Sequence, residues 1–128
     1  PLDGVIIVST PQEVALADAR RGVNMFKMDN VKVPIIGLVE NMSWFTPKEL
    51  PDNKYYIFGR DGAKNLSEGL GIPFLGQVPI VQSLRESGDT GQPAVLQANS
   101  EISNLLGDMV SKFIIEMNII EKSKNNER

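Results

Sequence analysis

The sequence predicts an α/β domain in which a mostly parallel sheet is flanked by helices. Two observations carry this prediction: short unalternating apolar runs at residues 4–9, 35–39 and 73–78, and an amphipathic segment between the first two runs. Such runs are typical of strands that are buried on both faces, as in parallel sheets. A strand, a helix and a second strand within about thirty residues form the right-handed crossover that joins parallel neighbours.

The first strand is expected over residues 4–9, and three signals mark the helix that follows it. Thr10 can cap the helix, Pro11 suits its first position, and Glu13 completes a capping box. We expect this helix to end near residue 30. Its predicted buried stripe consists of Leu16, Ala19, Val23 and Phe26.

The second strand, at residues 35–39, leads into a long surface segment. Residues 44–54 contain two prolines and show no periodicity, which indicates a loop, and residues 55–58 could form a short strand that closes it. Asp61 is expected to cap a second helix that ends at Gly71. The inward residues of that helix are predicted to be Ala63, Leu66 and Leu70.

The third strand is expected over residues 73–78, followed by one or two helical turns at residues 81–87 and a glycine-rich turn at 88–91. A last helix should begin near Ser100. Its apolar stripe consists of Ile102, Leu106, Met109, Phe113, Met117 and Ile120. Residues 122–128 are polar and expected to be disordered, so the predicted domain spans residues 1–121.

Composition bounds the possible functions. With 41% hydrophobic and 23% charged residues, the 128-residue chain is typical of a globular domain. Its formal charge of -3 argues against a nucleic-acid partner, and no apolar run reaches the roughly 20 residues that span a bilayer. The chain has no Cys and no His, so it offers neither a thiol nucleophile nor an imidazole base. The lack of disulfides fits a cytoplasmic location.

Candidate binding residues follow the second and third strands, at the edge where open parallel sheets bind ligands. Asn41 could hydrogen-bond the edge of a ligand or merely cap a turn. Gln77, Val78 and Pro79 could line the same crevice with backbone groups, although a proline after a strand often only ends the pairing.

Other conspicuous residues have structural readings. Trp44, Phe45, Tyr55 and Tyr56 could form a recognition surface, but such aromatics more often pack a long loop against its domain. Asp18 and Arg21 are three residues apart and are expected to pair on a solvated helix face.

The chain contains no G-x-x-x-x-G-K-[ST] and no G-x-G-x-x-G motif. The glycines at residues 59–62 and 69–71 are interpreted as turn and cap glycines rather than as phosphate cradles. From the residues alone, the sequence predicts part of a parallel α/β domain. Its strand ends could bind a ligand, and it contains no catalytic motif of its own.

Four segments carry a family resemblance: PLDGVIIVSTPQEVALADARRGVNMF, VPIIGLVENMSWF, YYIFGRDGAKNL and GIPFLGQVPIVQSLRESGDTGQP. In this order they resemble the second half of the Mrp/ApbC proteins, in the MinD/ParA group of deviant Walker A P-loop ATPases. The resemblance implies a partial P-loop NTPase fold of the SIMIBI type, with three layers. The N-terminal half of that fold, with its phosphate-binding loop, would precede Pro1.

Members of this family look like ATP-dependent carriers of iron–sulfur clusters. The resemblance implies a homodimer that binds ATP with Mg between its subunits and delivers a cluster to recipient apoproteins. Asn41 matches the asparagine that hydrogen-bonds the adenine edge in the wider group, and residues 77–79 match the segment that packs against the base. The present chain would be the adenine-recognising half, which by itself should be inactive.

The chain departs from the family in one place. Typical carriers have a C-x-x-C pair in the loop after ENMS, where a dimer can bridge a cluster with four thiolates. Here the loop contains no cysteine, and carboxylates such as Glu49 and Asp52 are poor substitutes for sulfur. This puts a cluster bridged in that way in doubt. The alternative is a positioning or partition switch of the MinD/ParA type, which acts through partner binding.

Adenine contacts alone predict weak nucleotide binding, because charge-assisted bonds to the phosphates contribute most of the affinity. We therefore expect the 128-residue chain to bind ATP with a dissociation constant of about 1 mM or weaker. Titration calorimetry on the isolated chain tests this, and micromolar binding would contradict it.

Overall fold

A computed structural model describes residues 2–97 and 100–128 of the chain. Its three strands form one parallel sheet in the order β1 (Val5–Ser9), β2 (Ile35–Glu40) and β3 (Phe74–Gln77). The sheet confirms the α/β class with parallel strands, and each strand lies within one residue of its predicted bounds.

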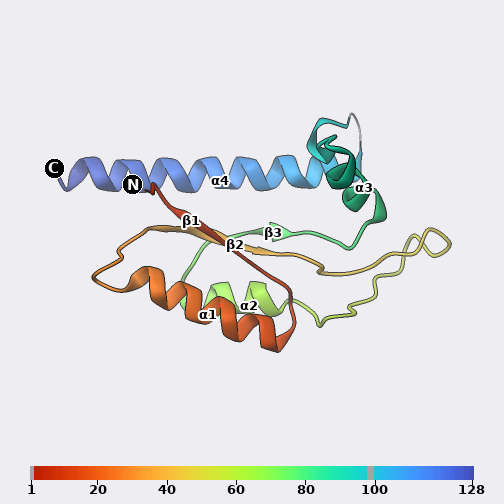
Figure 1. Cartoon of the computed structure of the whole chain (residues 1–128), viewed down its shortest axis with the longest axis horizontal. Coiled ribbons are helices and arrows are strands. Elements are labelled where there is room, and N and C mark those ends of the chain that lie inside the picture. The colour runs from red at the N-terminus through yellow and green to blue at the C-terminus, as the bar shows by residue number, and fades with distance from the viewer. Residues whose placement is uncertain (1, 98–99) are drawn as a thin grey trace.

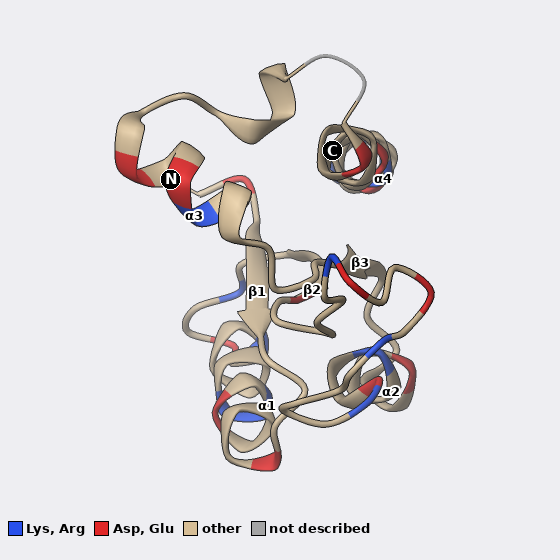
Figure 2. Ribbon diagram, turned by 90° about the vertical axis from the view of Figure 1, so that its right-hand side faces the viewer, with Lys and Arg blue, Asp and Glu red and all other residues tan. Residues whose placement is uncertain are grey.

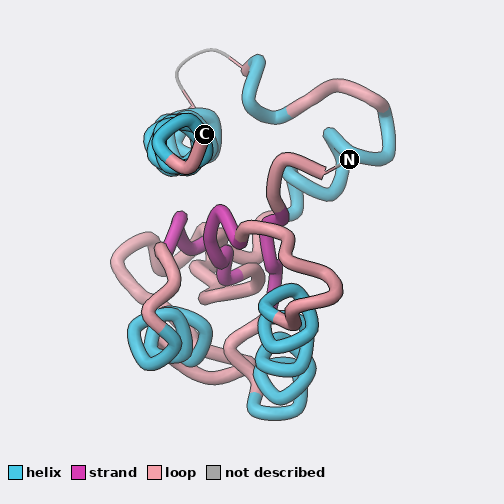
Figure 3. The backbone as a smooth tube through the Cα atoms, turned by 90° about the vertical axis from the view of Figure 1, so that its left-hand side faces the viewer, coloured by secondary structure: helices cyan, strands magenta, loops and turns pink. Residues whose placement is uncertain are grey.

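Helices cover the sheet on two sides and make three layers (Figures 1 and 3). One side carries α1 (Glu13–Lys27) and α2 (Gly62–Leu70), and the long helix α4 (Glu101–Asn126) crosses the other. Two shorter elements, α3 (Gln82–Thr90) and the 3-10 turn η1 (Ala94–Leu96), connect β3 to α4.

The central strand β2 divides the core in two because its side chains alternate between the faces. Leu38 is fully buried and packs on the α1 and α2 side, in a cluster with Val23, Ala63 and Ile72. Val39 points to the opposite side, where Leu75 and Val78 join it and Met109 of α4 covers them. β2 is therefore buried on both faces, as its apolar sequence predicts.

The prediction that β1 is also buried on both faces is wrong for this structure. Ile6 is 41% exposed and Val8 is 61% exposed. The reason is tertiary: α4 lies over β2 and β3, which leaves this face of β1 without a covering helix. Within the described residues β1 pairs with β2 alone, so its second edge has no neighbour.

Helix α1 begins later and ends earlier than its sequence signals predict. Its N-cap is Gln12 rather than Thr10, and its last helical residue is Lys27 rather than residue 30. Thr10 and Pro11 form the connection from β1, and Pro11 is buried there. The predicted stripe is confirmed, since Ala19 and Val23 are buried while Leu16 and Phe26 are half-buried.

Helix α2 has the predicted bounds but not the predicted cap. Asp61 occupies the N-cap position in a left-handed conformation, with φ 55°, and its side chain makes no capping hydrogen bond. Gly71 ends the helix in the left-handed conformation that glycine adopts without strain, as predicted. The polar group that does cap α2 comes from β2 and is described with the candidate site.

The long segment between β2 and α2 projects from one end of the molecule (Figure 1). Residues 55–58 do not form the predicted strand. Only Tyr55 pairs, in an isolated antiparallel bridge with Phe45, and Phe45 also bridges Ile80. The first bridge closes the segment on itself, and the second ties it to the residues that follow β3.

The C-terminal part of the chain is more helical than predicted. Residues 88–90 complete α3 instead of forming a turn, and Gly91 caps that helix. Ser100 caps α4 as expected, and its side chain accepts a hydrogen bond from the Ser103 N–H. Residues 122–126, expected in a disordered tail, continue α4. All six residues of the predicted α4 stripe are half-buried.

Charged residues of both signs are mixed on α1 and α2, and β1 carries none (Figure 2). Among the described residues, no helix combines the length and apolarity that a membrane crossing requires.

The free edge of β1 predicts self-association of the isolated 128-residue chain, because unpaired apolar edges template pairing. Sedimentation velocity should show concentration-dependent association. A Val8→Lys substitution should reduce it, since a charge on an edge strand opposes pairing. Val14→Lys, at a 75% exposed position on α1, is the matched control and should change nothing. A folded monomer of the unsubstituted chain at all concentrations would contradict this.

A second prediction concerns the contact between α2 and the β1–α1 connection. A Cβ atom at Gly62 would clash with the Pro11 carbonyl oxygen, so Gly62→Ala should destabilise the fold by about 1–3 kcal/mol. Gly69→Ala on the same helix meets no atom within 4 Å and should stabilise by about 0.5–1 kcal/mol. Urea unfolding measures both, and equal effects would refute the close contact.

Candidate functional site

The candidate site lies at the carboxyl edge of the sheet, where three strand residues stand in register. Ser9, Glu40 and Gln77 are paired across β1, β2 and β3. Ser9 and Glu40 are buried, whereas Gln77 is half-buried. The side chains at this edge are therefore in fixed positions relative to the strands, as a ligand site requires.

Glu40 is the central side chain of this edge, and it was not among the sequence-predicted site residues. Its carboxylate is fully buried. Oε2 accepts hydrogen bonds from the Ala63 N–H at 2.9 Å and the Lys64 N–H at 3.4 Å. These are among the first N–H groups of α2, which have no partner inside the helix. Glu40 thus caps α2 from a strand, and its negative charge lies at the positive end of the helix dipole.

The other carboxylate oxygen of Glu40 ties β2 to β3. Oε1 accepts a hydrogen bond from Gln77 Nε2 at 3.1 Å. The same Gln77 nitrogen donates to Asp61 Oδ1 at 2.6 Å, which explains why the Asp61 side chain is not available to cap α2. The three side chains form a polar network in which Gln77 lies between two carboxylates.

Asn41 follows Glu40 directly and is half-buried. Its N–H donates to the Ser9 carbonyl at 2.8 Å, which holds its backbone against the end of β1. Its side-chain Oδ1 accepts from the Met42 N–H at 2.8 Å, and Met42 has a left-handed φ of 56°. The Asn41 side chain therefore stabilises a turn. This hydrogen bond fixes the orientation of the amide but uses only its oxygen atom.

Residues 77–79 lie beside Asn41 at the next strand end, as predicted, but they differ in accessibility. The Val78 N–H donates to the Glu40 carbonyl at 2.8 Å, and the Val78 carbonyl accepts from the Ser43 N–H at 2.9 Å. Val78 and Pro79 are both buried. The backbone groups of Val78 are thus engaged within the protein. Of the predicted site residues, Asn41 and Gln77 are the ones with accessible side chains.

Two aromatic rings of the segment 44–60 contact basic side chains of the same segment. The Lys54 ammonium lies 4.1 Å from the centre of the Trp44 ring, and the Arg60 guanidinium lies 4.8 Å from that of Tyr56. Phe45 and Tyr55 exchange two backbone hydrogen bonds of 2.8 Å. The expected pair of Asp18 and Arg21 also forms, on the exposed face of α1.

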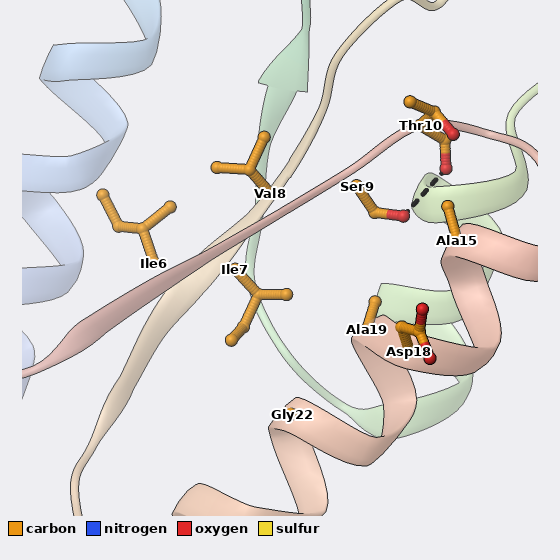
Figure 4. A pocket seen from close by; sticks show the side chains of 9 residues that line it. All are labelled: Ile6, Ile7, Val8, Ser9, Thr10, Ala15, Asp18, Ala19 and Gly22. Carbon is orange, nitrogen blue, oxygen red and sulfur yellow. Dashed lines mark hydrogen bonds between the residues drawn. The ribbon is translucent and has the colours of Figure 1, made fainter.

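A groove of about 470 Å³ lies elsewhere, between β1 and α1 (Figure 4). It is lined by residues such as Ile7, Val8 and Ala19, with the Ser9 hydroxyl donating to the Thr10 carbonyl at its end. Asn41 and Gln77 do not line it. The groove follows the edge of β1 that has no paired strand among the described residues, and it shares Ser9 with the strand-end site.

Within residues 2–97 and 100–128, no three acidic side chains come together as a metal site would need. With no Cys or His in the sequence, the chain offers oxygen and nitrogen hydrogen-bonding groups at its strand ends and neither a thiolate nor an imidazole ligand for a transition metal.

Comparison with known proteins gives this edge a context. Residues 1–114 match the family model described as ParA: NUBPL iron-transfer P-loop NTPase. The chain is 48% identical over 128 residues to the iron-sulfur cluster transfer protein NUBPL of Dictyostelium discoideum, covering 99% of this chain and 39% of that protein. It is 50% identical over 96 residues to the iron-sulfur cluster carrier protein of Synechocystis, covering 75% of this chain and 27% of that protein. The chain thus spans at most about two fifths of the length of these relatives.

A solved structure agrees with this match. The nucleotide-binding protein of Archaeoglobus fulgidus, in complex with ADP, superposes with a TM-score of 0.59 and 32% sequence identity, over 70% of this chain and 36% of that chain. The parallel sheet, the family model and the relatives point to the same group of proteins. The chain belongs to the ParA-type family of iron-transfer P-loop NTPases, in which iron–sulfur cluster carriers are found.

Proposed function

We propose that the protein is an ATP-dependent carrier of iron–sulfur clusters, and that this chain forms the part of its ATPase domain that recognises the base. The observation that carries the proposal is the half-buried Asn41 at the carboxyl edge of a parallel sheet, directly after β2 and next to the end of β3. The ADP bound to a structural neighbour of this chain supports a nucleotide as the ligand.

The chain's own residues would bind and orient the nucleotide. The Asn41 side chain has Oδ1 engaged by the Met42 N–H, which leaves the Nδ2 hydrogens to bond an acceptor on the base. Val78 and Pro79 would pack against the base. The groups that hold phosphates and Mg²⁺ would come from outside these 128 residues, which contain no Walker A motif.

The chain's chemistry also bears on the cluster, which is the cargo. Iron–sulfur clusters are held by thiolates, and residues 41–60 contain none. We therefore propose that any cluster is held by residues outside this chain, with the protein acting as a homodimer on recipient apoproteins.

A second candidate function rests on the same absence of cysteine. A positioning or partition ATPase of the MinD/ParA type would need the nucleotide site and no cluster ligand. Anaerobic reconstitution of the full-length protein with iron and sulfide separates the two. Stable loading of a cluster supports the carrier, whereas ATP hydrolysis without any loading supports the partner-binding switch.

The nucleotide site has its own test. Full-length protein should bind ATP, and Asn41→Ala should weaken the binding about tenfold, the effect of one lost hydrogen bond of roughly 1.4 kcal/mol. Asn24→Ala, on the exposed face of α1, is the matched control and should leave affinity unchanged. Titration calorimetry measures all three proteins. Absence of both ATP binding and hydrolysis in the full-length protein would refute the proposed function.

A further inference from the structure

The end of β2 carries a bulge in its pairing with the residues that continue β3. The Val78 N–H donates to the Glu40 carbonyl at 2.8 Å, and the Val78 carbonyl accepts from the Ser43 N–H at 2.9 Å. In a regular parallel ladder, the two residues that bond one partner residue are two positions apart, because the pleat repeats every two residues. Glu40 and Ser43 are three positions apart, so one extra residue is inserted between them. Bulges re-aim side chains and are frequent beside active sites.

The backbone of Met42 accommodates this bulge. Met42 has a φ of 56°, in the left-handed region that glycine adopts freely and a long side chain seldom does. Both ends of the bulge are anchored, since Glu40 and Ser43 are fully buried and the Ser43 hydroxyl donates to the Glu40 carbonyl at 3.1 Å. Strained backbone persists only where its surroundings hold it, and it is concentrated at functional sites. The conformation of Met42 therefore points to a function at this strand end.

The bulge fixes the side chain of Asn41. The Met42 N–H donates to Asn41 Oδ1 at 2.8 Å, and because only the oxygen of an amide can accept, this bond decides which way round the amide lies. Nδ2 has no hydrogen-bond partner among the described residues, where no buried side-chain nitrogen lacks one. Because Asn41 is only half-buried, its Nδ2 is therefore exposed to solvent.

The conformation of Met42 and the orientation of the Asn41 amide depend on each other. Because the chain is anchored at Glu40 and Ser43, Met42 can leave the left-handed region only if the peptide group between Asn41 and Met42 rotates. The same rotation interconverts the two commonest types of β-turn. It would carry the Met42 N–H away from Asn41 Oδ1 and leave the amide free to turn over.

We propose that Met42 is a positioning residue for the nucleotide: its left-handed backbone holds the Asn41 amide so that Nδ2, a donor, is the atom offered to the base. The proposal rests on the proposed function, since it requires a base at Asn41. An amide that is fixed before the ligand arrives need not be ordered on binding, so less affinity is lost to conformational entropy. The Met42 side chain, which is 41% exposed, need not touch the ligand.

The test uses the full-length protein, titrated with ATP in a calorimeter. Met42→Ile keeps an apolar side chain but disfavours the left-handed conformation, because Ile is branched at Cβ. We expect it to release the Asn41 amide and to weaken ATP binding about two- to tenfold, the cost of ordering one side chain on binding. Met42→Gly adopts the left-handed region without strain and should bind ATP more tightly than Met42→Ile. Equal losses in the two variants would mean that the Met42 side chain itself acts, and would overturn the proposal.

A double-mutant cycle shows whether Met42 acts through Asn41. In protein that carries Asn41→Ala, no amide remains to be oriented, so the addition of Met42→Ile should cause no further loss of ATP affinity. Losses that add, as those of independent sites do, would contradict the proposal.

Lys32 provides the matched control for backbone strain. It is also left-handed, with a φ of 43°, and its side chain is 71% exposed, but it precedes β2 and so lies at the opposite edge of the sheet. Lys32→Ile should lower the free energy of unfolding about as much as Met42→Ile does, as measured with urea, and leave the affinity for ATP unchanged. An equal loss of affinity in Lys32→Ile would trace the effect to stability and refute a positioning role.

Failure of this proposal can be told from failure of the proposed function. If the unsubstituted protein binds ATP and Met42→Ile binds it equally well, Met42 has no positioning role and the proposed function stands. If the unsubstituted protein binds no ATP, both fail. A loss that is seen in Met42→Ile, and is absent from Lys32→Ile and from the Asn41→Ala background, supports the proposal.

Discussion

The carboxylate of Glu40 is the constraint on which this end of the molecule depends. It lies fully buried at the end of the central strand, and its hydrogen bonds reach the first turn of α2 and the end of β3. A buried carboxylate without such partners would be strongly unfavourable. Because three donors, the Ala63 and Lys64 N–H groups and the Gln77 amide nitrogen, converge on it only in the folded arrangement, the carboxylate makes the relative placement of β2, β3 and α2 interdependent. Because Asn41 follows Glu40 directly, its backbone position is fixed by the same contacts.

The two faces of the sheet differ in how completely they are covered. On one face α1 and α2 meet β1 and β2 around Leu38, and on the other α4 covers β2 and β3. The exposed side chains of β1 and the groove along its edge occur together, on the strand that pairs on one side alone among the described residues. The strand-end site does not need a further strand beside β1, because β2, β3 and α2 position its side chains.

The long segment after β2 is anchored by backbone bridges and by ring–cation contacts. Its path in this structure therefore depends on hydrogen bonds of the backbone and on basic side chains stacked on aromatic rings.

Local sequence patterns were sufficient to predict the parallel strands, the crossover, the stripes of α1 and α4, and the glycine cap of α2, because each depends on residues near in the chain. Asn41 and Gln77 were placed at one edge for the same reason: parallel strands end together. Only the tertiary structure decided the rest. Asp61 has the sequence of a helix cap, yet Gln77 takes its carboxylate and Glu40, 23 residues before Ala63, caps the helix. The pairing of groups so far apart in the chain is a property of the packed sheet, and no local pattern encodes it.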